Sequence, residues 1–131
     1  MKTNIKATSI SLTPAISDYV KSKISHLDRL AQNFDDAMAN VEVGKTTEHH
    51  KTGNYFFAEI NIHMDGSNFR KVVDDENLYA AIDLAKDDME ETLSSYLKRK
   101  NTLVRRSGRA VKNFVKGFYN RKSKDRIELF L

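Results

Sequence analysis

The chain has no cysteine, a single proline and only five glycines in 131 residues. Without cysteine it forms no disulfide, holds no metal through thiolates and has no cysteine nucleophile. The glycines are scattered, and none belongs to the glycine-rich pattern that cradles phosphate ahead of a helix. No run approaches the roughly 20 apolar residues of a membrane span, and the first ten residues lack the apolar core of a signal peptide. We therefore expect a soluble, cytoplasmic protein.

Residue patterns typical of catalysis or metal binding are also missing. His49–His50 is an adjacent pair in a polar loop and cannot easily face one ion, and no acidic ligand lies at metal spacing. The acidic pairs Asp74–Asp75 and Asp87–Asp88 fit a solvated helix start and helix face better than acid–base catalysis. No serine stands in a nucleophile-elbow pattern. The sequence predicts neither an enzyme, nor a cofactor, nor a metal site.

The charge of the chain is divided at one point. Residues 1–97 contain 10 Lys and Arg against 16 Asp and Glu, a net charge of −6. Residues 98–131 contain 12 Lys and Arg against 2 acids, a net charge of +10. Folding needs no such segregation, because mixed charges solubilise a surface equally well. An acidic body with a basic tail indicates that the tail meets a polyanion while the body is a folded support.

Helix and strand signals predict the order β-α-β-β-β-α. Thr13 can cap a first helix and Pro14 suits its first position. This helix is predicted to continue to Phe34, on an apolar stripe formed by Ile16, Val20, Ile24, Leu27 and Ala31. A second helix is predicted from Glu76 to about Lys100, on a stripe formed by Leu78, Ile82, Ala85, Met89, Leu93 and Leu97.

Strands are predicted over residues 3–10, 38–45, 55–64 and 69–73, with a hairpin turn at Asp65-Gly66. Residues 55–64 alternate between apolar and polar, which is typical of an antiparallel sheet covered on one side. The fold class is therefore α+β, with two helices on one face of a four-stranded sheet. We expect one domain over residues 1–100 and a basic, flexible extension over residues 101–131.

The extension has the composition of a nucleic-acid-binding segment. Its affinity for phosphates would depend steeply on salt through counterion release. Aromatic residues at 114, 118 and 119 can stack on unpaired bases. Two alternatives remain open: a solvated tail without a fixed partner, and a basic amphipathic segment on an anionic membrane or a protein surface. The basic residues in question are Lys98, Arg99, Lys100, Arg105, Arg106, Arg109 and Lys112.

The two helices carry a resemblance to a known family. The first begins Thr13-Pro14-Ala15-Ile16 and continues through Tyr19-Val20, Lys23 and Leu27, and the second begins Leu78-Tyr79-Ala80-Ala81-Ile82-Asp83. Together with the element order, these segments resemble the ribosome hibernation promoting factor family, which includes ribosome-associated inhibitor A, over about residues 2–100. Long forms of that family add a C-terminal dimerisation domain, so the chain is similar to a short form with a basic extension.

The resemblance implies a topology like that of a double-stranded RNA-binding domain and a function on the ribosome. Family members bind 16S rRNA in the small subunit, between head and body, where they occlude the tRNA and mRNA sites in starvation or stationary phase. We expect no DNA or membrane partner and a monomer off the ribosome. The alternative function is a divergent member acting as a non-enzymatic scaffold, whose basic amphipathic tail binds a protein partner or an anionic membrane.

The resemblance also suggests rRNA contacts and shows departures from the family pattern. Lys23 matches a basic contact of the family, but His26 replaces a second lysine of the first helix. On the second helix, Asp88, Glu91 and Ser95 stand where the family often has Lys or Arg. Acids repel phosphate, so we hypothesise that the binding surface has shifted toward the C-terminal end of this helix and the tail.

The predicted site follows from this hypothesis. Tyr79 is expected to pack at the helix start. Second-rank contacts, each as easily an ordinary surface residue, are His26, Arg29, Lys45 and Lys86. The leading predicted rRNA contacts are Lys23, Arg70, Lys98, Arg99, Lys100, Arg105, Arg106 and Arg109.

Overall fold

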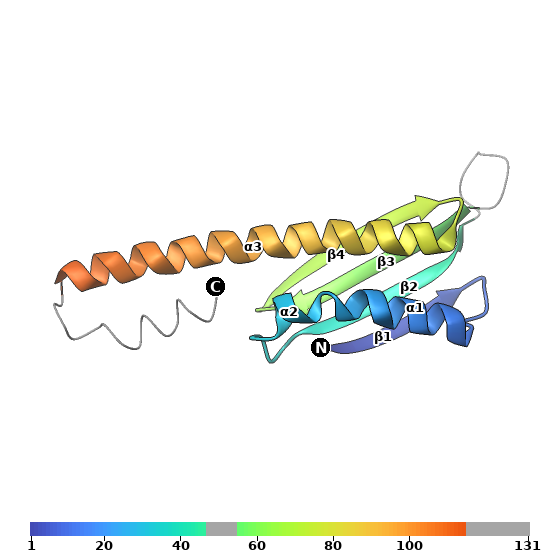
Figure 1. Ribbon diagram of the computed structural model, residues 1–131, viewed down its shortest axis with the longest axis horizontal. Coiled ribbons are helices and arrows are strands. Elements are labelled where there is room, and N and C mark those ends of the chain that lie inside the picture. Colours follow the sequence, from blue (N-terminus) through green and yellow to red (C-terminus); the bar gives the residue numbers. More distant parts are fainter. Residues whose placement is uncertain (47–54, 115–131) are drawn as a thin grey trace. The chain divides into compact units, whose positions relative to one another are not determined.

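The computed structural model describes residues 1–46 and 55–114, and of residues 104–114 it describes the backbone alone. The histidine pair at 49–50 and the aromatic residues 118–119 lie outside the described residues. The chain divides into two units, Met1–Thr92 and Leu93–Leu131. The elements are β1 (Lys2–Thr8), α1 (Pro14–Ser25), α2 (Asp28–Ala31), β2 (Met38–Thr46), β3 (Tyr55–Met64), β4 (Ser67–Asp75) and α3 (Leu78–Phe114), as Figure 1 shows.

The four strands form one sheet in the order β1-β2-β3-β4. β1 and β2 pair in parallel, whereas β2–β3 and β3–β4 pair antiparallel. The antiparallel pairing expected from residues 55–64 is confirmed for β3, which is antiparallel to both of its neighbours. β1 is parallel to β2 because α1 and α2 form a helical crossover, which returns the chain in the same direction. The predicted hairpin at Asp65-Gly66 is confirmed, and both residues have positive φ, 56° and 71°, as a type I′ turn requires.

One face of the sheet forms the core with the helices. Register places Ile5, Val41 and Ile60 in one row on this face. α1 and the first turns of α3 cover it in Figure 1, which confirms the α+β class with both helices on one side. The predicted stripes are largely buried, with fully buried side chains at Val20, Ile24, Leu27, Ile82, Met89 and Leu93.

The start of each long helix has a side-chain cap. Thr13 Oγ1 accepts the amide hydrogen of Ile16 at 3.2 Å, as predicted. Asn77 Oδ1 accepts the amides of Tyr79 and Ala80 at 2.9 and 3.2 Å and fixes the start of α3, a cap that the sequence pattern did not reveal.

The ends of both predicted helices need correction. The first helix stops at Ser25, well before Phe34, because the amides of His26 and Leu27 bond three residues back, to Lys23 and Ile24, and tighten the backbone. The last helix runs to Phe114 and passes Lys100. Beyond Lys100 the apolar stripe fades, but Leu, Arg, Lys and Ala still favour helix, and Gly108 alone costs only about 1 kcal/mol.

The described residues also bear on membrane and metal sites. In residues 1–46 and 55–114, no helix combines the length and the apolarity that a bilayer crossing needs. The same part of the chain contains no group of three metal-ligating side chains.

Candidate nucleic-acid interface

A line of polar contacts joins α3 to α1 and α2 within the first unit. One ridge of α3 presents Tyr79, Asp83, Lys86 and Glu90, which are spaced at helical intervals. Three of these residues meet partners on α1 and α2. We call the whole set the helix seam, defined as Tyr19, Lys23, Arg29, Tyr79, Asp83, Lys86 and Glu90.

Asp83 organises the first end of the helix seam. Its Oδ1 accepts the hydroxyl hydrogen of Tyr19 at 2.6 Å and lies 3.1 Å from Lys23 Nζ. The hydrogen bond to Asp83 raises the pKa of both Tyr19 and Lys23. Burial acts to raise the pKa of Asp83, but the hydrogen bonds from Tyr19 and Lys23 outweigh it and lower that pKa. Lys23 is therefore a cation held against an ionised carboxylate.

Glu90 organises the other end. Lys86 Nζ lies 2.8 Å from Glu90 Oε2 and 3.4 Å from Asp87 Oδ1, while Arg29 Nη2 lies 3.7 Å from Glu90 Oε1. The hydrogen bond between Lys86 and Glu90 raises the pKa of the lysine and lowers that of the glutamate. The side chain of Lys86 is only 12% exposed, so its charge is largely compensated within the protein.

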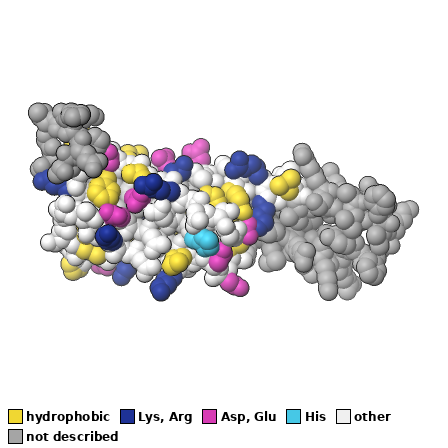
Figure 2. Space-filling view, turned by 180° about the vertical axis from the view of Figure 1, so that it is seen from behind, with side chains coloured by type: hydrophobic (Ala, Val, Ile, Leu, Met, Phe, Trp, Pro, Cys, Tyr) yellow, Lys and Arg dark blue, Asp and Glu magenta, His cyan; other side chains and the backbone are white. Residues whose placement is uncertain are grey.

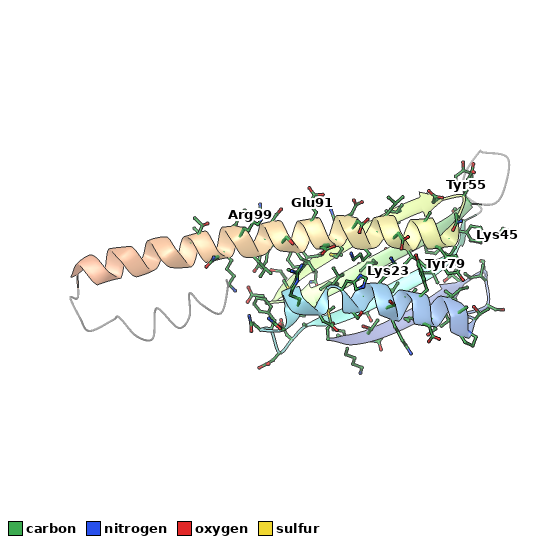
Figure 3. The ribbon with its side chains drawn as sticks, viewed as in Figure 1. Lys23, Lys45, Tyr55, Tyr79, Glu91 and Arg99 are labelled. Carbon is green, nitrogen blue, oxygen red and sulfur yellow. The ribbon has the colours of Figure 1, made fainter. Side chains whose placement is uncertain are left out.

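The seam therefore contains three of the predicted basic contacts, Lys23, Arg29 and Lys86, and each has a carboxylate partner. In Figure 3, Lys23 lies between α1 and α3, whereas Glu91 points away from α1. Glu91 and Asp88 are both exposed, so the acids that depart from the family pattern face solvent.

Arg70 lies apart from the helix seam. Register puts it in a row with Asn61, on the face of the sheet opposite the core, where it pairs with Glu59. Figure 2, which views the molecule from behind, shows charges of both signs interspersed with apolar side chains. The structure therefore does not bring Arg70 together with Lys23.

The two remaining candidates of the body lie outside the seam. Lys45 is half-buried near the end of β2, where its register partner on β3 is Phe56. His26 follows the last residue of α1 and is exposed.

The second unit contains the other predicted contacts, all on α3. Lys98 and Arg99 are exposed, and neither forms an ion pair with any acid in the described part of the chain. Lys100 is half-buried and has an interaction partner. Arg105, Arg106 and Arg109 lie on the helical backbone of α3.

Sequence reasoning missed three members of the seam as parts of a site, Tyr19, Asp83 and Glu90. Tyr79 was expected only to pack at the helix start, and Tyr19 and Asp83 entered as family signposts. A signal for them exists in the spacing of Tyr79, Asp83, Lys86 and Glu90, which places an aromatic and alternating charges on one helix face.

The chain belongs to the Sigma 54 modulation protein / S30EA ribosomal protein family, whose model matches residues 3–101. It is 33% identical over 105 residues to the ribosome hibernation promotion factor of Picosynechococcus sp., covering 77% of this chain and 51% of that protein. The factor of Bacillus subtilis is 31% identical over 108 residues, covering 82% and 54%. The chain thus spans about half the length of these two curated relatives.

Two further similarities cover most of the other protein. The ribosome hibernation promoting factor of Azotobacter vinelandii is 33% identical over 99 residues, which are 76% of this chain and 85% of that protein. The crystal structure of the Thermus thermophilus Protein Y N-terminal domain superposes with a TM-score of 0.63 at 31% identity, over 73% of this chain and 99% of that one. These findings confirm the family resemblance and the fold.

Proposed function

We propose that the chain is a ribosome hibernation factor that binds 16S rRNA in the small subunit and occludes the tRNA and mRNA sites under stress or in stationary phase. It acts in the cytoplasm, without catalysis and without a DNA partner, as a monomer off the ribosome. The observation that carries this proposal is the family match over residues 3–101, together with the fold of the Protein Y N-terminal domain. The names of the relatives supply the activity.

We further infer that the C-terminal part of α3 provides most of the affinity for rRNA. Counterion release rewards cations that are not already compensated by protein carboxylates. In the first unit, Lys23, Arg29, Arg70 and Lys86 all have carboxylate partners. Lys98 and Arg99 are exposed and form no ion pair with a described acid, which supports the shift of the binding surface expected from the sequence.

A competition assay tests the occlusion directly. Labelled tRNA is bound to 30S subunits programmed with mRNA, and the full chain is added in increasing amounts. The proposed function requires tRNA binding to fall in parallel with occupancy by the chain. Occupancy of the 30S subunit with unchanged tRNA binding would show that the chain binds elsewhere, and binding to anionic vesicles but not to subunits would favour the scaffold alternative.

Glu90→Gln is expected to strengthen binding to 30S subunits roughly three- to tenfold, because it releases Arg29 and leaves Lys86 with only its longer contact to Asp87. Each cation that then contacts a phosphate adds about 0.9 to the slope of log K against log salt. The measurement is a salt titration of 30S binding for wild type and variant.

Glu91→Gln is the matched control, since it removes the same charge from an exposed neighbour that forms no ion pair within the described residues. An equal gain for both variants would assign the effect to net charge alone. No change for Glu90→Gln would show that the seam does not contact the RNA.

A further inference from the structure

Tyr79 is a partly exposed aromatic side chain at the start of the helix seam. Its side chain is on the surface, with 40% of the residue exposed. Its amide donates to Asn77 Oδ1 at 2.9 Å, so the helix cap fixes its backbone. In the described part of the chain, its hydroxyl has no hydrogen-bond partner. Packing against the protein therefore covers only part of the Tyr79 side chain, and the rest is open to solvent.

Tyr19 supports the ring of Tyr79 from the side. The two rings meet edge to face, with centroids 4.8 Å apart and planes at 90°. Two further contacts fix the position of Tyr19: its hydroxyl donates to Asp83, and Lys23 Nζ lies 5.3 Å from its ring centroid. A ring supported in this way loses little side-chain entropy when a ligand stacks on it.

Lys23 places a positive charge next to this aromatic pair. Its ammonium group uses Asp83 as a partner, yet the side chain remains 28% exposed. An ammonium group has three donors, so one can reach a phosphate oxygen while the ion pair persists. Tyr19 links the two residues, because its ring lies 5.3 Å from Lys23 Nζ and 4.8 Å from the ring of Tyr79. An aromatic surface beside an accessible cation matches the chemistry of a nucleotide with its base unpaired.

We propose that Tyr79 stacks on an unpaired base of the bound RNA, with the phosphate of that nucleotide on Lys23. This inference rests on the proposed function and deepens it, because it assigns a single-stranded or looped-out nucleotide to the helix seam. Every base has a π face, so such a platform selects unpaired RNA over duplex RNA without selecting a sequence.

The test uses the full chain with Tyr79→Leu, Tyr79→Phe and Tyr79→Trp, and Tyr55→Leu as the matched control. Binding is measured to 30S subunits, to a ten-nucleotide single-stranded RNA and to the duplex of the same sequence, across a salt range. Thermal melting of each variant ensures that binding is measured on folded protein. Tyr79→Leu is expected to weaken binding to 30S subunits and to the single strand about tenfold.

The salt slope separates stacking from charge. Tyr79→Leu leaves the slope unchanged because no cation is removed. Lys23→Gln lowers the slope by at most about 0.7, the value for one full single-strand phosphate contact, because Asp83 already compensates part of the lysine's charge. Tyr79→Phe and Tyr79→Trp keep the ring and are expected to bind like wild type. Tyr55→Leu is expected to change neither affinity nor slope.

Other outcomes overturn the inference. Wild-type binding by folded Tyr79→Leu, or equal weakening by Tyr79→Leu and Tyr79→Phe, would exclude a stacking role, as would loss of duplex binding to the same extent. Failure of the proposed function is separable from failure of this inference. If the chain does not bind 30S subunits but binds the single strand through Tyr79, the inference stands and the proposed function falls.

Discussion

Replacing Lys98, Arg99 and Arg105 by glutamine is expected to lower the affinity of the chain for 30S subunits about a hundredfold near physiological salt, since each lost phosphate contact reduces the salt slope by about 0.9. Lys98 and Arg99 are exposed, and glutamine keeps the helix propensity of this part of α3. A salt titration of 30S binding should therefore show a slope smaller by about two to three.

The matched control removes three basic residues from the other face of the sheet, Lys2, Lys6 and Arg70. Register places all three on the side opposite the core, and Lys2 and Lys6 are exposed. This triple variant is expected to bind 30S subunits like wild type. Equal weakening of both triple variants would show that the loss of affinity depends on net charge alone. A larger loss of affinity in the control would indicate that Arg70 contacts the rRNA.

Gly44→Ala is expected to lower the free energy of unfolding by about 3 kcal/mol, at the upper end of the usual cost of overpacking. A Cβ at Gly44 would collide with the backbone oxygen of Thr8 and would lie 2.7 Å from Cε1 of Phe57. The ring of Phe57 can shift, but the oxygen belongs to the strand paired with β2 and cannot retreat without breaking the ladder. Urea denaturation followed by circular dichroism measures the loss.

Gly66→Ala is the control for this prediction. Gly66 has a positive φ of 71°, but a Cβ there meets nothing within 4 Å. The substitution should cost only about 1 kcal/mol, from backbone strain in the turn. If Gly44→Ala lowered the free energy of unfolding no more than Gly66→Ala, then β1 and Phe57 would not approach Gly44 as closely as described.

Local pattern sufficed for the fold where two signals agreed. Residues 55–64 alternate and end in an Asp-Gly turn, and β3 begins and ends at the predicted residues. The ends of the two helices were predicted incorrectly, because an apolar stripe indicates which residues are buried and not where the backbone hydrogen bonds of a helix end. Leu27 continues the stripe of α1 although its amide bonds three residues back, and α3 runs on after its stripe fades.

The candidate site was less predictable, because its meaning depends on pairing between distant residues. The sequence marks Lys23 as a cation, but its partner Asp83 is brought to it only by the packing of α3 against α1. Strand alternation did not place Arg70 either, since Val72 and Val73 put an apolar residue on each face of β4. Charge segregation along the chain, in contrast, is visible without a structure.

Sedimentation of the full chain with purified ribosomal subunits tests the central claim most directly. Gradients are run with 30S and with 50S subunits at about 50 mM and about 200 mM salt, the range over which phosphate contacts weaken strongly. The account predicts that the chain sediments with 30S subunits at the lower salt, that this association falls sharply at the higher salt, and that 50S subunits retain none. Association with 50S subunits alone, with neither subunit, or with 30S subunits independently of salt would contradict it.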